Sequence, residues 1–227
     1  MGGEAILTTH SSCWHTRMAT LGPNISADEA LQRLIEGNER FLGGTTRWDR
    51  VTVASLATLA SGQQPFATIF GCSDSRVPPE LVFDAGLGEL FVVRVAGNVM
   101  SSEVAGSLQY AGSHLRTPLF VVLGHDGCGA VAAALETRRS GALQLSRIRI
   151  LVDSILSGLD GIDPDLSPAE QLSLAVERNV RWTLQQIAES PEGQARLREG
   201  QIKLKGGIYE LASGRVRWLD GDAMTAF

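Results

Sequence analysis

Three short apolar runs, separated by segments with helical patterns, restrict the fold of this chain more than any other feature. The runs are FATIFG (66–71), ELFVVRV (89–95) and LFVVLG (119–124). They are almost wholly apolar rather than apolar at every second position, which is typical of strands in a sheet covered on both faces. Strands that alternate with helices in this way predict a parallel sheet with right-handed crossovers.

The helical segments have recognisable ends. The first begins at Ser26, which forms a predicted capping box with Glu29, and ends at Gly43–Gly44. Further helices are predicted over residues 102–115, 129–139, 145–158 and 168–190, with a short helical turn after the first strand. At the end of the chain, QIKLKGGIYEL and RVRWL predict two strands joined by a turn at Ser213–Gly214. The expected fold class is α/β: a central, mostly parallel β-sheet flanked by helices, with an N-terminal helical arm and a C-terminal strand pair.

The chain divides into a tail and one domain. Residues 1–24 show no clear period and end in Gly22–Pro23, so we expect a disordered tail. Met18 could be the natural start, in which case residues 1–17 would not belong to the native protein. Residues 25–221 are expected to form a single domain, because no repeat divides them and 227 residues are near the upper limit for one compact domain.

Composition argues against several classes of partner. The formal net charge of −5 and the pI near 5.4 argue against nucleic acid or an anionic membrane surface. No apolar run approaches the roughly 20 residues of a membrane span, and the first residues lack the apolar core of a secretory signal. The three cysteines (Cys13, Cys72 and Cys128) are too few for a disulfide framework. We therefore expect a cytoplasmic protein that binds neither membrane nor nucleic acid.

Potential metal ligands follow two of the predicted strands. Cys72 comes directly after FATIFG, and His125 and Cys128 follow LFVVLG with H-x-x-C spacing. Parallel strands bring their carboxyl ends to one edge of the sheet, where ligands bind in open α/β folds. Two cysteines and one histidine suit tetrahedral zinc with one position left open. A closed structural site would need a fourth ligand, and Cys13, His10 or His15 of the tail could supply it.

An aspartate and an arginine stand beside the first cysteine. Asp74 and Arg76 come two and four residues after Cys72. They could form an ordinary surface ion pair, which would contribute little to stability. Beside a metal, an ionised Asp74 could instead accept the proton of a bound hydroxide, while Arg76 holds the carboxylate and keeps its pKa low. This interpretation predicts a reactive site.

These segments resemble those of a known enzyme family. CSDSR (72–76) and GHDGCGA (124–130) are similar to the two signature segments of bacterial β-class carbonic anhydrases, and the similarity extends from about Ala30 to Asp220. The resemblance implies one Zn²⁺ per subunit held by Cys72, His125 and Cys128. It implies a catalytic dyad of Asp74 and Arg76, and reversible hydration of carbon dioxide to bicarbonate and a proton by attack of zinc-bound hydroxide.

The resemblance also implies substrate-binding residues and self-association. Gln63 matches a glutamine that hydrogen-bonds substrate or bicarbonate, and Phe91 and Tyr110 match aromatic positions of the substrate pocket, some contributed by a neighbouring subunit. The alternative for both rings is plain core packing. Family members form dimers or higher assemblies, with the N-terminal helix (here residues 27–42) gripping a partner, so a homodimer or homotetramer is expected.

Several alternatives remain open at the level of sequence. In some family members the dyad aspartate ligates zinc in a closed resting site, and a tryptophan three residues before the first cysteine helps to bind bicarbonate. Ile69 stands at that position here, which favours the open kind without deciding whether Asp74 is a fourth ligand. A hydrolase of carbonyl sulfide or carbon disulfide is a rival reading, and a zinc-stabilised structural or bicarbonate-sensing module is another. The intact Asp74–Arg76 pair favours carbon dioxide over both.

Overall fold

The structure is a computed structural model of the chain, and it describes residues 25–48, 52–141 and 146–221. The expected tail over residues 1–24, with Cys13 and Met18, lies outside the described residues. The sheet has five strands in the order β2-β1-β3-β4-β5. Their bounds are β1 Ala67–Gly71, β2 Leu90–Arg94, β3 Leu119–His125, β4 Lys203–Tyr209 and β5 Val216–Trp218. β1 to β4 are parallel and β5 runs antiparallel to β4, so the predicted fold class is confirmed.

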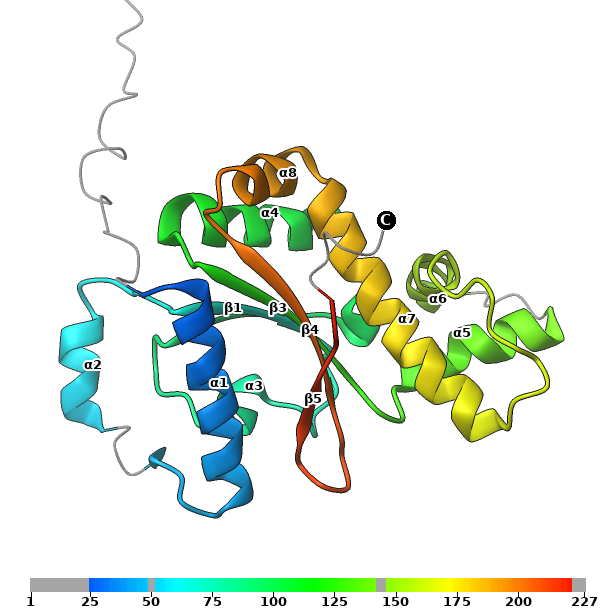
Figure 1. Cartoon of the computed structure of the whole chain (residues 1–227), viewed down its shortest axis with the longest axis horizontal. Coiled ribbons are helices and arrows are strands. Elements are labelled where there is room, and N and C mark those ends of the chain that lie inside the picture. Colours follow the sequence, from blue (N-terminus) through cyan, green and yellow to red (C-terminus); the bar gives the residue numbers. More distant parts are fainter. Residues whose placement is uncertain (1–24, 49–51, 142–145, 222–227) are drawn as a thin grey trace, which may run out of the picture.

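Helices cover both faces of this sheet (Figure 1). Their bounds are α1 Ala27–Leu42, α2 Val53–Leu59, α3 Pro79–Val82, α4 Ser102–Tyr110, α5 Gly129–Ser140, α6 Ile148–Leu156, α7 Pro168–Glu189 and α8 Pro191–Arg198. A short 3₁₀ turn, η2 (Ala96–Asn98), follows β2, and a π turn, η3 (Ala111–Leu115), follows α4. None of the helices in these described segments is long and apolar enough to cross a membrane.

The strands bury side chains on both faces, as their apolar sequences predict. Phe70 and Val122 join a core with α4, α5, α6 and α7, whereas Ile69 and Val121 join a second core with α1 and α3. Each strand residue of β1 and β3 is buried. Two cores on one sheet fix the strands firmly, so the loops at their carboxyl ends start from rigid positions.

Some predicted helix ends differ from those observed. Ser26 caps α1 by accepting a hydrogen bond from the Glu29 N–H, but the Glu29 carboxylate pairs with Arg33 instead of completing the box. The helix predicted over 102–115 ends at Tyr110, because the chain widens into η3 and stops at Arg116, whose φ is 55°. Helix α8 was not predicted; Ser190 ends α7 and also caps α8.

Candidate metal centre and active site

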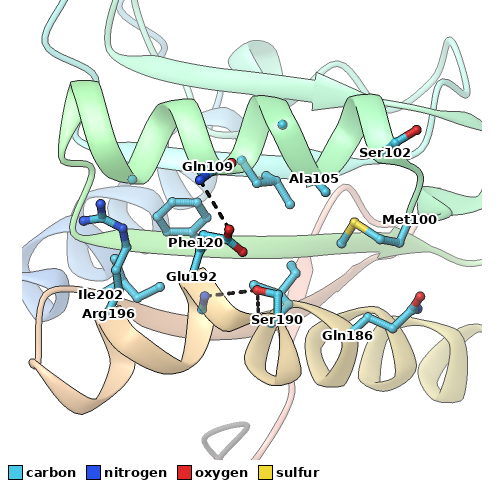
Figure 2. Close-up of a pocket in the computed structure, with 15 residues that line it drawn as sticks. Met100, Ser102, Ala105, Gln109, Phe120, Gln186, Ser190, Glu192, Arg196 and Ile202 are labelled. Atoms are coloured by element: carbon cyan, nitrogen blue, oxygen red, sulfur yellow. Dashed lines mark hydrogen bonds between the residues drawn. The ribbon is translucent and has the colours of Figure 1, made fainter.

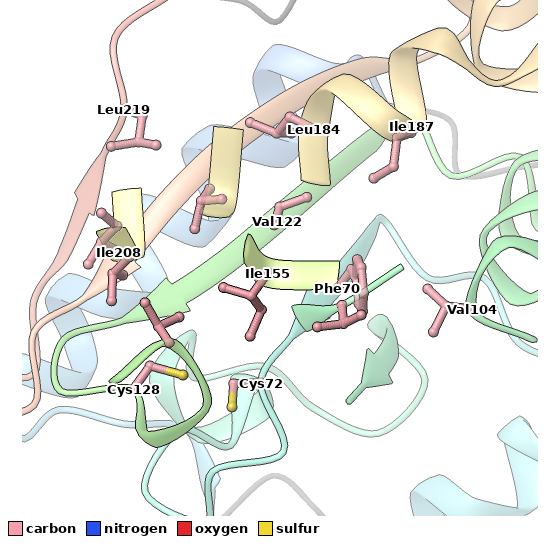
Figure 3. Close-up of a cluster of buried hydrophobic side chains, with 14 of the residues drawn as sticks. Phe70, Cys72, Val104, Val122, Cys128, Ile155, Leu184, Ile187, Ile208 and Leu219 are labelled. Carbon is pink, nitrogen blue, oxygen red and sulfur yellow. The ribbon is translucent and has the colours of Figure 1, made fainter. Parts of the chain in front are cut away.

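Cys72, His125 and Cys128 meet at the carboxyl edge of the sheet, as predicted. Cys72 directly follows β1, His125 is the last residue of β3, and Cys128 is the N-cap of α5. Their ligand atoms all lie within 4.8 Å of one another, and all three side chains are buried. Figure 3 shows the two sulfur atoms facing the same space at the border of the hydrophobic cluster.

The imidazole of His125 is oriented for a ligand. Its Nδ1 lies 2.9 Å from the carbonyl oxygen of Asp126. Because a carbonyl oxygen can only accept a hydrogen bond, Nδ1 carries the hydrogen and is the donor. Nε2 then keeps a free lone pair, and this buried atom has no hydrogen-bond partner among the described residues. Ligating histidines commonly have this arrangement, with one nitrogen held by a carbonyl and the other directed at the metal. A buried Nε2 beside two sulfur atoms fits a metal ion better than it fits plain packing.

The two thiols influence each other strongly. A hydrogen bond with Cys128 is the largest of several effects that lower the pKa of Cys72, against the opposing effect of burial. The same hydrogen bond, together with burial, raises the pKa of Cys128. Two buried thiols this close cannot both ionise without a cation. A divalent ion would neutralise both thiolates, and the Cys₂His donor set is one that zinc prefers.

Asp74 and Arg76 form a two-pronged ion pair at the entrance of the cluster. Arg76 Nε lies 2.9 Å from Asp74 Oδ1 and Arg76 Nη2 lies 2.8 Å from Oδ2. The backbone N–H of Arg76 also donates to Oδ1. The Arg76 side chain therefore holds the pKa of Asp74 well below its usual range. Asp74 Oδ2 is 3.8 Å from His125 Nε2, so an ionised carboxylate stands next to the space between the ligands.

Two residues that support this site were not singled out in the sequence. Arg94, at the end of β2, donates from Nε to the carbonyl oxygen of Cys72 at 2.9 Å and from Nη2 to that of Asp74 at 2.6 Å. Asp126 accepts a hydrogen bond from the Leu211 N–H at 2.8 Å, which ties the His125 segment to the end of β4. A charged residue at the end of the apolar ELFVVRV strand was the one sequence signal for Arg94.

Gln63, Phe91 and Tyr110 lie away from this chain's own metal centre. Gln63 is exposed and precedes the start of β1, whereas Cys72 follows its end. Phe91 pairs with Thr68 near the start of the strands, about 10 Å from their carboxyl edge at 3.3 Å per residue. The Phe91 and Tyr110 rings lie 6.1 Å apart, and Tyr110 stacks on His114. The structure thus brings the two aromatic residues together, but not to the cysteines.

A cavity of about 410 Å³ lies elsewhere, between α4 and the helices α7 and α8 (Figure 2). Met100, Leu108 and Phe120 form part of its apolar lining, and Gln109 reaches Glu192 across it. None of the residues around it belongs to the metal cluster or to the Asp74–Arg76 pair. It is separate from the site described above.

Comparison with known proteins identifies the family. The model of the carbonic anhydrase family matches residues 67–216, which include the whole of the site. The chain belongs to the β-carbonic anhydrase family. Among curated relatives, carbonic anhydrase 2 of Mycobacterium tuberculosis is 43% identical over 195 residues, 85% of this chain and 93% of that protein. The carbonic anhydrase of Mycolicibacterium smegmatis is 38% identical over 196 residues, 86% of this chain and 94% of that protein.

Solved β-carbonic anhydrases share the fold. The β-carbonic anhydrase CcaA superposes with a TM-score of 0.69 at 28% identity, covering 84% of this chain and 95% of that one. The Coccomyxa β-carbonic anhydrase in complex with acetazolamide gives a TM-score of 0.68 at 27% identity, covering 85% and 87%. The predicted family, enzyme class and zinc-dependent hydration of carbon dioxide are confirmed by this membership and by the clustered ligands.

Proposed function

We propose that Cys72, His125 and Cys128 hold the zinc at which this carbonic anhydrase converts carbon dioxide to bicarbonate and a proton. The observation that carries the proposal is the convergence of their three buried ligand atoms beside an arginine-held carboxylate. A zinc ion held there would supply the nucleophile by lowering the pKa of a bound water towards neutrality. The three protein ligands come from the ends of two adjacent strands, β1 and β3. Three protein ligands are typical of a catalytic zinc site, which keeps its fourth position for water or substrate.

In this proposal, Asp74 orients the nucleophile and Arg76 keeps Asp74 in place. An ionised carboxylate only accepts hydrogen bonds, so Asp74 fixes the direction of a hydroxyl proton and leaves the oxygen lone pair for the substrate carbon. Arg76 engages both carboxylate oxygens, which keeps Asp74 charged over the whole neutral range. Since both oxygens are held by Arg76, we favour the open arrangement, in which Asp74 does not ligate the metal.

We further propose that two chains complete each other's sites in a homodimer. Strand β2 is an edge strand, half-buried along its whole length, and its sequence LFVVR is apolar up to Arg94. An edge strand presents unpaired backbone N–H and C=O groups, and a strand of another chain can pair with them. A two-fold axis perpendicular to the strands makes such a pair antiparallel, so the start of one β2 meets the end of the other. Phe91 would then stand beside the metal centre of the second subunit, with Tyr110 and Gln63 near it.

The short helix that follows the expected arm (residues 27–42) supports the same assembly. Helix α2 lies at the periphery of the molecule (Figure 1), and its Val53 and Leu56 are 83% and 48% exposed. Apolar side chains on a protruding helix are typical of a surface that a partner covers. A tetramer formed from two such dimers is the larger alternative; two β-carbonic anhydrases of Sordaria macrospora with this fold are described as tetrameric.

A reducing compartment, and thus the cytoplasm, is the location we propose. Cys72 and Cys128 are free cysteines whose sulfur atoms lie within 4.8 Å of each other. Oxidation to a disulfide would remove two metal ligands at once. The active enzyme therefore depends on conditions that keep both thiols reduced.

The test is stopped-flow hydration of carbon dioxide over the neutral to alkaline range, with metal analysis of the same samples. We expect one zinc per chain in the wild type, in Asp74→Ala and in Arg76→Ala. Hydration by both variants should fall by about 10²-fold or more, the usual contribution of a positioned proton-handling group. Wild-type turnover in either variant would exclude the proposed dyad.

Two controls sharpen this experiment. Arg139 and Glu136 form a similar but exposed ion pair on α5, so Glu136→Gln should leave hydration unchanged. Carbonyl sulfide and carbon disulfide, offered to the same samples, test the alternative substrates. Turnover of either gas above that of carbon dioxide would contradict the proposed substrate.

A further inference from the structure

A buried polar network joins α7 to the 3₁₀ turn η2. Asn179 Nδ2 donates to the carbonyl oxygen of Gly97 at 2.8 Å. Thr183 Oγ1 donates to the carbonyl oxygen of Asn98 at 3.1 Å, and Asn98 Nδ2 donates back to Thr183 Oγ1 at 3.3 Å. All three polar side chains are at most 2% exposed. Buried polar groups of this kind are costly to leave without partners, so their positions are strongly determined.

The turn that they hold has an unusual backbone. Gly97 and Asn98 both have positive φ, at 68° and 44°. After glycine, asparagine is one of the residues that enter this region most readily, because its short polar side chain can hydrogen-bond locally. Such conformations persist where the surroundings enforce them. Here the carbonyl groups of both residues are fixed from α7, so the turn depends on a helix more than 80 positions away in the sequence.

This turn also contacts the metal cluster. The backbone N–H of Gly97 donates to Cys72 Sγ at 3.3 Å. A Cβ at position 97 would lie 2.8 Å from Ile155 Cδ1 and 3.0 Å from Ala130 Cβ, so only glycine fits this close approach without a shift. A hydrogen bond to a thiolate withdraws negative charge from its sulfur. The carbonyl group of Gly97, in its peptide bond to Asn98, is therefore held by Asn179 of α7, and its N–H, in the peptide bond to Ala96, is aimed at a ligand sulfur.

We propose that Asn179 and Thr183 are positioning residues, which hold η2 so that the Gly97 N–H limits the charge that Cys72 donates to the metal. The inference rests on the proposed role of Cys72 as a zinc ligand. Two thiolates offset the whole charge of Zn²⁺ and so weaken its effect on bound water. An N–H aimed at one of them restores part of that effect, in the manner of other groups that surround metal ligands.

The test uses the cobalt-substituted protein, because the thiolate-to-cobalt charge-transfer absorption reports directly on the sulfur. Thr183→Val keeps the shape of the side chain and removes both bonds with Asn98, and Asn179→Leu removes the bond to Gly97. We expect both variants to move the absorption to longer wavelength, since a thiolate without its N–H donor gives up charge more easily. Thr183→Ser, which retains the hydroxyl, should keep the wild-type spectrum.

The matched control is another buried threonine. Thr117 Oγ1 lies 2.6 Å from Thr68 Oγ1 near the start of the strands, and both residues are fully buried. Thr117→Val should lower stability and leave the spectrum unchanged. We also expect zinc-loaded Thr183→Val to hydrate carbon dioxide about 10-fold to 100-fold more slowly near neutral pH, with its activity profile shifted to higher pH.

Each outcome decides the proposal. If Thr183→Val and Asn179→Leu bind cobalt and absorb at the same wavelength as the wild type, the network has only a structural role. A shift in Thr117→Val of the same size would also overturn the proposal, because the effect would then not be specific to η2. The absence of any thiolate-to-cobalt absorption in the wild type would instead contradict the metal site itself.

Discussion

Cys128 and Cys72 reach the same cluster from segments that are held in different ways. Cys128 is the N-cap of α5. Its hydrogen bond with Cys72 and its burial raise the pKa of its thiol, while the N–H groups of Val131 and Ala130 at the start of that helix act to lower it. Cys72 begins a segment without helix or strand that lasts until Pro79. Cys128 is thus placed by the start of its own helix, and Cys72 by residues that fold around it.

The contacts of the Cys72 segment come from far along the chain. Arg94 of β2 binds two of its carbonyl groups, and Gly97 of η2 binds its sulfur. The η2 turn is held in turn by α7. A helix start is a local structure that forms from nearby residues, whereas these contacts exist only in the complete fold. The Cys72 half of the site should therefore be the more sensitive half to distant substitutions.

Loss of either sulfur is expected to have the largest effect. Cys72→Ser and Cys128→Ser each remove one of three ligands, so both variants should lose stoichiometric zinc and fall to background hydration. Metal analysis after gel filtration, together with stopped-flow hydration, measures both quantities. If only one of the two variants retained one zinc per chain, the two cysteines would differ in importance, and the remaining two ligands would be sufficient to bind the metal.

Substitution of the supporting charged residues should separate the two halves. Arg94→Met removes the hydrogen bonds to Cys72 and Asp74 and is expected to lower hydration by about 10-fold to 100-fold. Asp126→Asn keeps an oxygen that can accept from Leu211, so its effect should be several-fold smaller. Hydration by purified, zinc-loaded variants decides the point. An equal loss in both would show that the charge of Asp126, and not only its hydrogen bond with Leu211, supports the site.

Two glycines allow the same comparison through the backbone. Gly97 and Gly127 have φ values of 68° and 61°, but a Cβ at 127 meets nothing closer than Leu211 Cδ1 at 4.0 Å. Gly127→Ala should therefore lower the free energy of unfolding by about 1–2 kcal/mol, the usual cost of the left-handed conformation. Gly97→Ala adds crowding against Ile155 and should lower it by a further 1–3 kcal/mol or so. Chemical unfolding of the zinc-loaded proteins measures both values, and equal values would show that the Gly97 side relaxes easily.

Removal of the metal should produce the smallest and most local difference. In the protein stripped with a chelator, we expect backbone amides of residues 72–77 to exchange with deuterium faster than in the zinc form. The amides of the first turn of α5 should change little, because the helix retains its own hydrogen bonds. Hydrogen exchange followed by peptide mass analysis measures both rates. Faster exchange in the first turn of α5 than in residues 72–77 would show that the Cys128 segment depends more on the metal.

The same contrast explains what the sequence could predict. The β1–β3 strands, most helices and the meeting of Cys72, His125 and Cys128 follow from local patterns and the geometry of parallel sheets. Helix α8 was missed because Ser190 serves two helices and no periodic apolar run marks the second. The roles of Arg94 and Asn179 could not be predicted, since each depends on a contact with a segment at least 20 residues away.

The aromatic residues show a further limit of sequence. Phe91 and Tyr110 are expected to line the substrate pocket, some of it contributed by a neighbouring subunit, and the strand register places both towards the opposite end of the sheet from this chain's own Cys72. Sequence motifs indicate which residues form a site, but they do not show which subunit of an assembly contributes each residue. The roles of Gln63, Phe91 and Tyr110 therefore stay predictions that depend on the proposed dimer.

The separation of Gln63 from Cys72 along β1 has a genetic consequence. If each active site takes its metal from one chain and its glutamine from another, Cys72→Ser and Gln63→Ala damage different halves. In a dimer of one Cys72→Ser chain and one Gln63→Ala chain, one active site contains both substitutions and the other contains neither. Two alleles that are each impaired alone would then complement each other in one cell, with a working site in every mixed pair.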